Sequence, residues 1–314
     1  MSFDQPIEDE AQPVVKRGYS IGVNRIHAPR LDPALYVVAT PIGHLADITI
    51  RALETLSGAE MIACEDTRVT RVLLDRYQIR TPLHAYHDHN AEQARPKILA
   101  ALAEGKAVAL VSDAGTPLVS DPGFKLVTAA VEAGYRVIPI PGASALLAAL
   151  VGAGLPTDAF LFAGFLSSRD EARRQRIEEL APLAATTIFY ESPHRLGDTL
   201  RDLAAIMGGS RQAVVARELT KTFEELVRGT LADLAARYAE QKPKGEIVIV
   251  VAPAPEEETT DDDVDRLLIA ALQHAAPGKA AAEVARLTGR DRKALYERVL
   301  ALKSPSADET KRSR

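Results

Sequence analysis

From Leu35 onward, short runs of apolar residues alternate with longer segments in which apolar residues recur every three or four positions. The short runs are typical of buried strands, and the longer segments are typical of amphipathic helices. This alternation predicts a mostly parallel, doubly wound α/β sheet over residues 34–142. Pro139 lacks a backbone N–H, so its strand is expected at an edge of that sheet. The strands predicted in this half are Leu35–Thr40, Met61–Cys64, Val108–Val111 and Val137–Ile140.

Residues 143–255 have a different order of elements, which predicts a second, mixed α/β domain. The predicted strands are Phe160–Phe165, Thr186–Tyr190, Ala213–Ala216 and Glu246–Val251. The predicted helices are Ser144–Val151, Asp170–Leu180, Leu196–Met207 and Leu231–Ala239.

The two ends of the chain lack this alternation. Residues 1–33 are polar and aperiodic, so they predict a flexible N-terminal arm. Residues 256–265 hold seven acidic residues and no basic one, which predicts an acidic linker. Residues 266–314 predict a small helical module with a tail. The spacing of Ala285, Gly289 and Leu295 in this module is similar to that of a helix-turn-helix. A nucleic-acid contact and a small module for helix packing or dimerisation both stay open.

Composition narrows the function classes. The formal charge of the 314 residues is −5 and would be +2 without the seven acids of the predicted linker, so a local basic face is compatible with the rest of the chain. Aromatic residues make up only 5%, which argues against base stacking as the main binding device. One cysteine, Cys64, excludes an internal disulfide. No apolar run is long enough to span a bilayer, and no signal-peptide pattern is present, so we expect a soluble, cytoplasmic protein with no membrane partner.

Gly- and Pro-rich polar segments follow several of the predicted strands. SDAGTP comes directly after Val108–Val111 and supplies Asp113, Gly115 and Thr116. Ligands of open α/β sheets bind outside the carboxyl ends of the strands, so this segment is expected on the rim of a ligand cleft, with a structural turn as the alternative. The chain has no dinucleotide-binding or P-loop glycine pattern after a strand, which disfavours a nicotinamide cofactor and a P-loop nucleotide.

Cationic side chains recur in the same strand-end segments. Together they favour a cleft that binds a polyanion, although ion pairs with nearby acids are an equally open interpretation on residue type alone. These cations are Arg68, Arg71, Arg195, Arg217 and Lys221.

Three histidines, His84, His87 and His89, stand in a predicted loop with Asn90 next to them. No further ligand set accompanies them, so no metal is expected. The loop is expected either to contact substrate or to be merely exposed.

The full series of segments resembles one family. The segments are VATPIGHLADIT, EDTR-x2-R, HDHN, SDAGTPLVSDPG, PGASA, YESPHR, ARELTK and GEIVIV. Their order from residue 35 to residue 252 is similar to that of the ribosomal RNA small-subunit methyltransferase I group, within the methyltransferases of tetrapyrrole-methylase type. The resemblance implies two α/β domains with S-adenosylmethionine in the cleft between them, and a homodimer. It also implies methyl transfer to the ribose 2′-oxygen of a decoding-centre cytidine in 16S ribosomal RNA of the small ribosomal subunit.

The resemblance also assigns site residues. The cofactor-binding positions it implies are Pro41, Gly43, Asp113, Gly115, Thr116, Ser144, Ala145 and Tyr190. For the proton acceptor the candidates are Glu65, Glu191 and His194. The substrate-binding candidates are Arg68, Arg71, Asn90, Arg195, Arg217 and Lys221. One residue departs from the family pattern, because His44 stands where the family usually has Asn.

Two alternatives stay open beside this function. One is methylation of a small tetrapyrrole, and the other is a non-catalytic RNA binder in ribosome assembly. The cationic segments favour RNA over a tetrapyrrole, which would need a larger apolar pocket.

Overall fold

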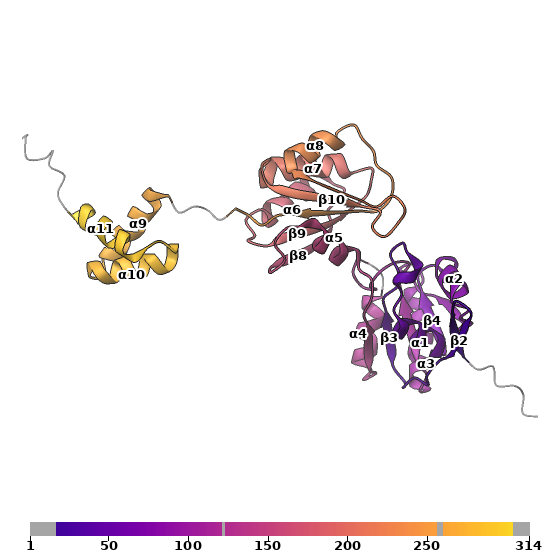
Figure 1. Cartoon of the computed structure of the whole chain (residues 1–314). Coiled ribbons are helices and arrows are strands. Elements are labelled where there is room, and N and C mark those ends of the chain that lie inside the picture. Colours follow the sequence, from indigo (N-terminus) through magenta and orange to yellow (C-terminus); the bar gives the residue numbers. More distant parts are fainter. Residues whose placement is uncertain (1–16, 121–122, 256–259, 304–314) are drawn as a thin grey trace, which may run out of the picture. The chain divides into compact units, whose positions relative to one another are not determined.

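A computed structural model describes residues 17–120, 123–255 and 260–303. The chain divides into two compact units, Met1–Ala254 and Pro255–Arg314. The first unit contains two five-stranded sheets and a small hairpin, and the second consists of helices (Figure 1). In the described ranges, no helix is long and apolar enough to cross a membrane.

The first sheet is entirely parallel, as predicted. Pro139 lies in an edge strand that pairs with only one neighbour, so its missing N–H costs no ladder hydrogen bond. The strands, in spatial order, are β5 (Leu83–Ala85), β4 (Met61–Cys64), β6 (Val108–Val111), β3 (Leu35–Val38) and β7 (Val137–Ile140).

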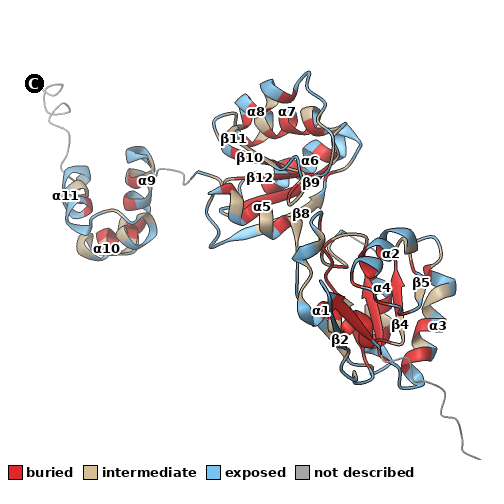
Figure 2. Cartoon of the chain, turned by 45° about the vertical axis from the view of Figure 1, so that its right-hand side comes forward, coloured by how far each residue is buried: buried red, intermediate tan, exposed pale blue. Residues whose placement is uncertain are grey.

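Helices cover both faces of this sheet, because successive strand residues point to opposite sides. Ile62 packs in the cluster on the α1 and α2 side, whereas Ala63 packs with α3 and α4. Figure 2 shows these strands buried and the outer faces of the helices exposed. The helices are α1 (Ile50–Gly58), α2 (Thr67–Arg76), α3 (Ala91–Ala103) and α4 (Phe124–Glu132), with a short 3-10 turn, η1 (Leu45–Asp47). Residues 121 and 122, which come shortly before α4 in the sequence, lie outside the described residues.

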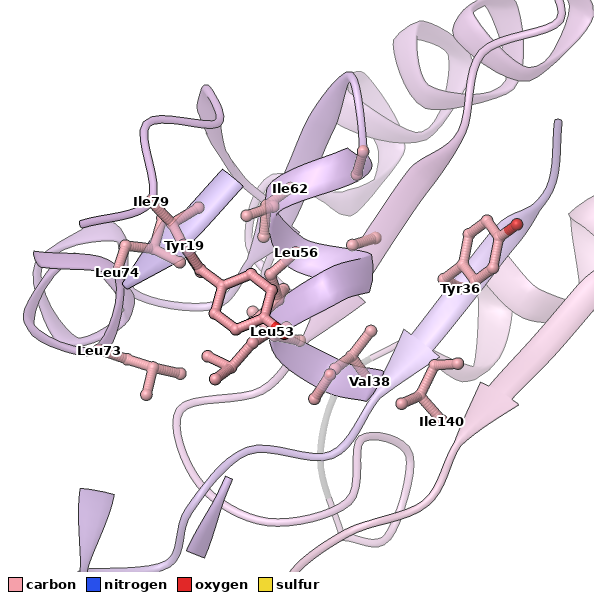
Figure 3. Packing of buried hydrophobic residues seen from close by; sticks show 14 of the residues in the cluster. Tyr19, Tyr36, Val38, Leu53, Leu56, Ile62, Leu73, Leu74, Ile79 and Ile140 are labelled. Carbon is pink, nitrogen blue, oxygen red and sulfur yellow. The ribbon is translucent and has the colours of Figure 1, made fainter. Parts of the chain in front are cut away.

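The prediction of a flexible arm is wrong for residues 17–33. They include an antiparallel hairpin, β1 (Gly18–Ile21) with β2 (Asn24–His27). Tyr19 is 1% exposed and packs among the residues of α1 and α2 (Figure 3), and the Ser20 N–H donates to the Tyr77 carbonyl at 2.8 Å. Ile26 and Leu31 pack against the same cluster. These apolar residues are too far apart in the sequence to form a periodic pattern. Residues 1–16 of the predicted arm lie outside the described range.

The second sheet is mixed, which confirms the prediction. Only β8 and β9 run parallel. The strands, in spatial order, are β11 (Glu225–Thr230), β10 (Gln212–Arg217), β12 (Ile247–Val251), β9 (Thr186–Glu191) and β8 (Phe160–Phe165). The sequence pattern missed β11, in which no residue is fully buried and three of the six residues are polar, and β5, which has three residues.

Helices again lie on both faces. Phe189 packs with the helices on one side, while Ile188 packs with α5 on the other (Figure 1). The first group contains α6 (Asp170–Leu180), α7 (Leu196–Met207) and α8 (Leu231–Tyr238), and the single helix opposite is α5 (Ala145–Ala153). The bounds of α6 and α7 coincide with those predicted.

The second unit contains three helices in its described part: α9 (Asp261–Leu272), α10 (Pro277–Thr288) and α11 (Arg292–Lys303). The predicted linker is therefore wrong for residues 261–265, which begin α9. Thr260 caps this helix, and acids in its first turn are stabilised by the helix dipole. Asp261 also pairs with Arg290 at 2.5 Å and with Arg298 at 3.1 Å. Residues 256–259 and 304–314 lie outside the described ranges.

The hairpin provides a test of the first domain's stability. Replacing Tyr19 by Ala should lower the free energy of unfolding by about 3 kcal/mol, because a fully buried ring leaves a cavity. Urea denaturation measures the change. Val23, fully exposed at the turn of the same hairpin, supplies the control, and Val23→Ala should change stability by less than about 0.5 kcal/mol. Equal effects of the two substitutions would contradict a structural role of the hairpin.

Candidate active site

Loops at the carboxyl ends of β4, β6 and β9 surround a cavity of about 450 Å³. Residues of both sheets line it, so it belongs to neither domain alone. Its apolar walls include Ile42, Val119, Phe165 and Tyr190, and its polar lining includes Glu65, Asp113, Thr116, Ser144, Glu191 and Glu246.

The structure brings most of the predicted cofactor-binding residues together. Those that line the cavity are Asp113, Gly115, Thr116, Ser144, Ala145 and Tyr190. Pro41 and Gly43 instead line a neighbouring cavity of about 310 Å³, which shares Ile42, Asp113 and Ala114 with the first. The two cavities therefore meet at the loop after β3 and the loop after β6.

The SDAGTP loop is tied to three other segments. Asp113 accepts a hydrogen bond from the Asp66 N–H at 2.9 Å. Gly115 exchanges backbone hydrogen bonds with Thr40, at 2.8 and 3.0 Å, and its φ of 79° favours glycine. Thr116 donates its hydroxyl to the Ala143 carbonyl at 3.1 Å. These contacts fix the loop that forms one wall of the cavity.

The loop after β3 touches the loop after β10. A Cβ atom on Gly43 would lie 2.4 Å from the Lys221 Cγ and 2.8 Å from the Thr220 Oγ1, so only glycine permits this approach. The His44 N–H donates to the same Thr220 hydroxyl at 3.1 Å. The His44 side chain turns back and accepts from the Ala46 N–H, which caps the short turn that follows. An imidazole thus provides a local hydrogen bond at the position where the family usually has Asn.

The three candidate proton acceptors differ in their surroundings. The Glu65 side chain lines the cavity, and no hydrogen bond to it is seen among the described residues. Glu191 also lines the cavity, but it is 3% exposed and accepts from the Ser192 N–H and the Thr199 hydroxyl. His194 is exposed and is not part of the cavity lining. Glu65 is therefore the candidate whose carboxylate is available to a ligand.

Burial raises the pKa of Glu65, and the negative charges of Asp113 and Asp88 raise it further. The neighbouring Asp66 behaves in the opposite way, because hydrogen bonds from Arg68 lower its pKa to about 2. Two adjacent carboxyl groups therefore have pKa values shifted apart, which is typical of sites that handle protons.

The predicted substrate-binding cations do not line this cavity. Arg68 pairs with Asp66 at 2.6 Å and is largely exposed. Arg195 donates to the Leu166 carbonyl at 2.7 Å and pairs with Glu191 at 3.4 Å. Both arginines lie at strand ends, as predicted, but each of them binds groups of the protein itself.

The remaining substrate-binding candidates also lie outside the cavity lining. Arg217 contacts Glu225 at 3.3 Å, and Lys221 pairs with Glu218 at 2.9 Å. Asn90 fastens its own loop, donating to the Ala85 carbonyl and accepting from the His87 N–H. Arg71 is exposed on α2, and no ion pair to it is seen in the described part of the chain.

The charge of the cavity is the reverse of the one predicted. Four carboxylates line it, and no lysine, arginine or histidine does. A cavity of this kind suits a cationic ligand better than a polyanion. The sequence pattern also assigned no role to Phe165, although it ends an apolar strand and stacks edge-on with Tyr190 at 5.6 Å. The position of Phe165 at the end of a predicted strand is the sequence signal that could have identified it as a site residue.

Comparisons with known proteins agree with this architecture. Residues 34–235 match a family model described as Tetrapyrrole (Corrin/Porphyrin) Methylases. Residues 258–303 match the model described as RsmI C-terminal HTH domain.

Curated relatives are similar over most of their length. Ribosomal RNA small subunit methyltransferase I of Mesorhizobium japonicum is 56% identical over 92% of this chain and 98% of its own. The protein of the same name from Escherichia coli O157:H7 is 47% identical over 85% of this chain and 94% of its own.

Solved structures share the fold. A cobalt precorrin-4 methyltransferase of cobalamin biosynthesis superposes with a TM-score of 0.56, at 18% identity, over 70% of this chain and 95% of its own. The methyltransferase CobJ does so with a TM-score of 0.54, at 24% identity, over 70% of this chain and 94% of its own.

The close approach at Gly43 is testable. Gly43→Ala should lower the free energy of unfolding by about 1–3 kcal/mol, because the added methyl group must push apart the loops after β3 and β10. Chemical denaturation measures this change. Gly229→Ala is the matched control, since a Cβ there meets nothing nearer than 3.6 Å. If Gly43→Ala were as well tolerated as the control, the contact between the two loops would have no energetic weight.

Proposed function

The chain belongs to the ribosomal RNA small subunit methyltransferase I family of the tetrapyrrole methylases, and on this premise we propose that it methylates the ribose 2′-oxygen of cytidine 1402 in 16S ribosomal RNA. The observation that carries this proposal is the extent of the similarity, which covers 92% of the chain, including the C-terminal helices, at 56% identity. S-adenosylmethionine is the cofactor of this family.

The cavity residues fit this cofactor. Its sulfonium and ammonium groups are cationic, and the lining offers four carboxylates and no lysine, arginine or histidine. Ile42, Val119 and Phe165 provide apolar surface for the adenine. Gly115 lines the cavity and has no side chain, so a ligand can approach its backbone there. We expect Asp113, Thr116, Ser144 and Tyr190 to hold the polar groups of the cofactor.

When bound, S-adenosylmethionine supplies an activated methyl group, so the protein must align the ribose hydroxyl and remove its proton. We assign proton removal to the Glu65 carboxylate, which lines the cavity and has a raised pKa. The methyl carbon would exchange its bond to sulfur for a bond to the 2′-oxygen, and the electron pair of the broken bond would leave with the neutral thioether of S-adenosylhomocysteine. The hydroxyl proton would pass to Glu65. Glu191 is assigned a positioning role, because its carboxylate holds the start of α7.

We also propose that the protein acts as a homodimer in the cytoplasm, where ribosomes assemble. Apolar side chains exposed on α5 and on the edge strand β8 support a second copy as partner. Leu147 and Val151 are 47% and 76% exposed, and Phe160 is 45% exposed.

The function is tested in cells that lack the gene. Mass analysis of their 16S ribosomal RNA should show one missing ribose methyl group, at cytidine 1402, and a plasmid copy of the gene should restore it. Unchanged RNA would contradict the proposal. Loss of a tetrapyrrole product instead would support the alternative substrate class, and altered subunit assembly with unchanged methylation would support a non-catalytic binder.

The role of Glu65 predicts a pH dependence. The base works only when ionised, so kcat should fall as the pH is lowered, at a higher pH than an ordinary glutamate would require, because the pKa of Glu65 is raised. Glu65→Gln should lower kcat about 10²- to 10⁴-fold and abolish this dependence. A pH series of single-turnover rates measures both effects.

Two controls accompany this experiment. His194→Gln should leave kcat largely unchanged, since His194 lies outside the cavity lining. Glu65→Gln should be no less stable than the wild type near neutral pH, because a raised carboxyl pKa means that ionised Glu65 destabilises the fold there. Full activity of Glu65→Gln would remove this residue from the proton transfer.

A further inference from the structure

Besides the two cavities described above, a groove lies beside the cavity of about 450 Å³ and has no part in the proposed proton transfer. It has a volume of about 540 Å³ and is formed by the β10–β11 hairpin and the segment between α8 and β12. Its lining includes Arg217, Phe223, Glu225, Arg237, Lys242 and Lys244.

The groove carries an excess of positive charge. Its one lining carboxylate, Glu225, is shared by two arginines, with Arg217 at 3.3 Å and Arg237 at 3.0 Å. Lys242 and Lys244 are exposed, and no ion pair to either is seen within the described ranges. Four cations thus face one anion, which is the charge pattern of a phosphate-binding surface.

An exposed aromatic ring lies among these cations. Phe223 is 71% exposed near the tip of the β10–β11 hairpin. The Phe223 ring packs in neither apolar cluster of the second domain, so it does not contribute to the core around the second sheet. A ring beside lysines is the combination with which proteins hold single-stranded nucleic acid, because bases stack on the ring and phosphates meet the cations.

The groove and the catalytic cavity are neighbours across β12. Arg217 in the groove pairs in register with Ile247, which lines the cavity. Lys244 of the groove is followed directly by Gly245 and Glu246 of the cavity lining. A strand of RNA that enters the cavity with one ribose can therefore continue into the groove with the next nucleotides.

We propose that this groove binds the single-stranded RNA next to the target nucleotide, with a base stacked on Phe223 and phosphates held by Lys242 and Lys244. The inference rests on the proposed function. The groove would supply, outside the cavity, the cationic contacts to phosphate that the acidic cavity lacks.

The experiment compares Phe223→Ala with Phe124→Ala. Phe124 is exposed to a similar degree, 69%, but lies on α4. Binding is measured with fluorescein-labelled single-stranded oligocytidylate, and methylation with small ribosomal subunits from cells that lack the gene. Phe223→Ala should bind the oligonucleotide about ten-fold more weakly and raise KM for the subunit, with little change in kcat and in S-adenosylmethionine affinity. Phe223→Trp should restore binding, and Phe124→Ala should behave as the wild type.

The lysines have their own readout. Lys242→Gln combined with Lys244→Gln should reduce the slope of log affinity against log salt by about 0.7 for each phosphate that is no longer neutralised. The same exchange at Lys106 and Lys125 should leave the slope unchanged.

Three outcomes would overturn the inference while the wild type still methylates subunits. These are unaltered oligonucleotide binding by Phe223→Ala, an equal effect of Phe124→Ala, and a change of oligomeric state by Phe223→Ala in sedimentation, which would make the groove an interface between copies of the chain. If the wild type does not methylate subunits at all, the proposed function fails instead.

Discussion

The contact between the loop after β3 and the loop after β10 is the constraint on which the site depends. Gly43 lies so close to Lys221 and Thr220 that no side chain fits, and the His44 N–H bonds to the Thr220 hydroxyl. This contact joins the two sheets beside the cavity that both of them line. Since neither sheet forms a complete cavity, cofactor binding and the stability of this contact are coupled. Substrate RNA that binds both loops would strengthen the same contact.

Charge is separated within the site. The cavity has carboxylates and no cationic side chain, while the cations of the same strand-end segments lie outside it. Their partners explain this separation, because Arg195 is held by backbone carbonyls and Arg217 by Glu225. An acidic cavity attracts a sulfonium and repels phosphate. In the proposed function, a polyanionic substrate would be held at the surface with one ribose inserted, and this arrangement would keep the phosphates away from Glu65.

The sequence predicted the helices and strands more accurately than the interaction partners of individual side chains. Helices α6 and α7 have the predicted bounds, because their apolar spacing and their ends are local properties of the chain. The hairpin around Tyr19 was missed, since its burial depends on helices that lie far along the sequence. For the site, strand-end position predicted a ligand cleft at Asp113, the family resemblance added Tyr190, and both residues line one cavity. Residue type could not tell which arginine pairs with protein and which faces solvent, because that depends on neighbours from other segments.

In the C-terminal unit, too, the number of basic residues in the sequence overestimates the positive charge that is available to a ligand. Its basic residues favour a nucleic-acid contact by number, but Arg290 and Arg298 pair with Asp261, and Arg298 also pairs with Asp265. These acids came from the segment predicted as a linker, so part of the acidic and part of the basic charge neutralise each other within one small helical unit. Fewer exposed lysines and arginines therefore remain on α10 and α11 than the sequence alone suggests. What a basic residue of this unit offers a ligand is set by the acids with which it pairs and not by the count of charges.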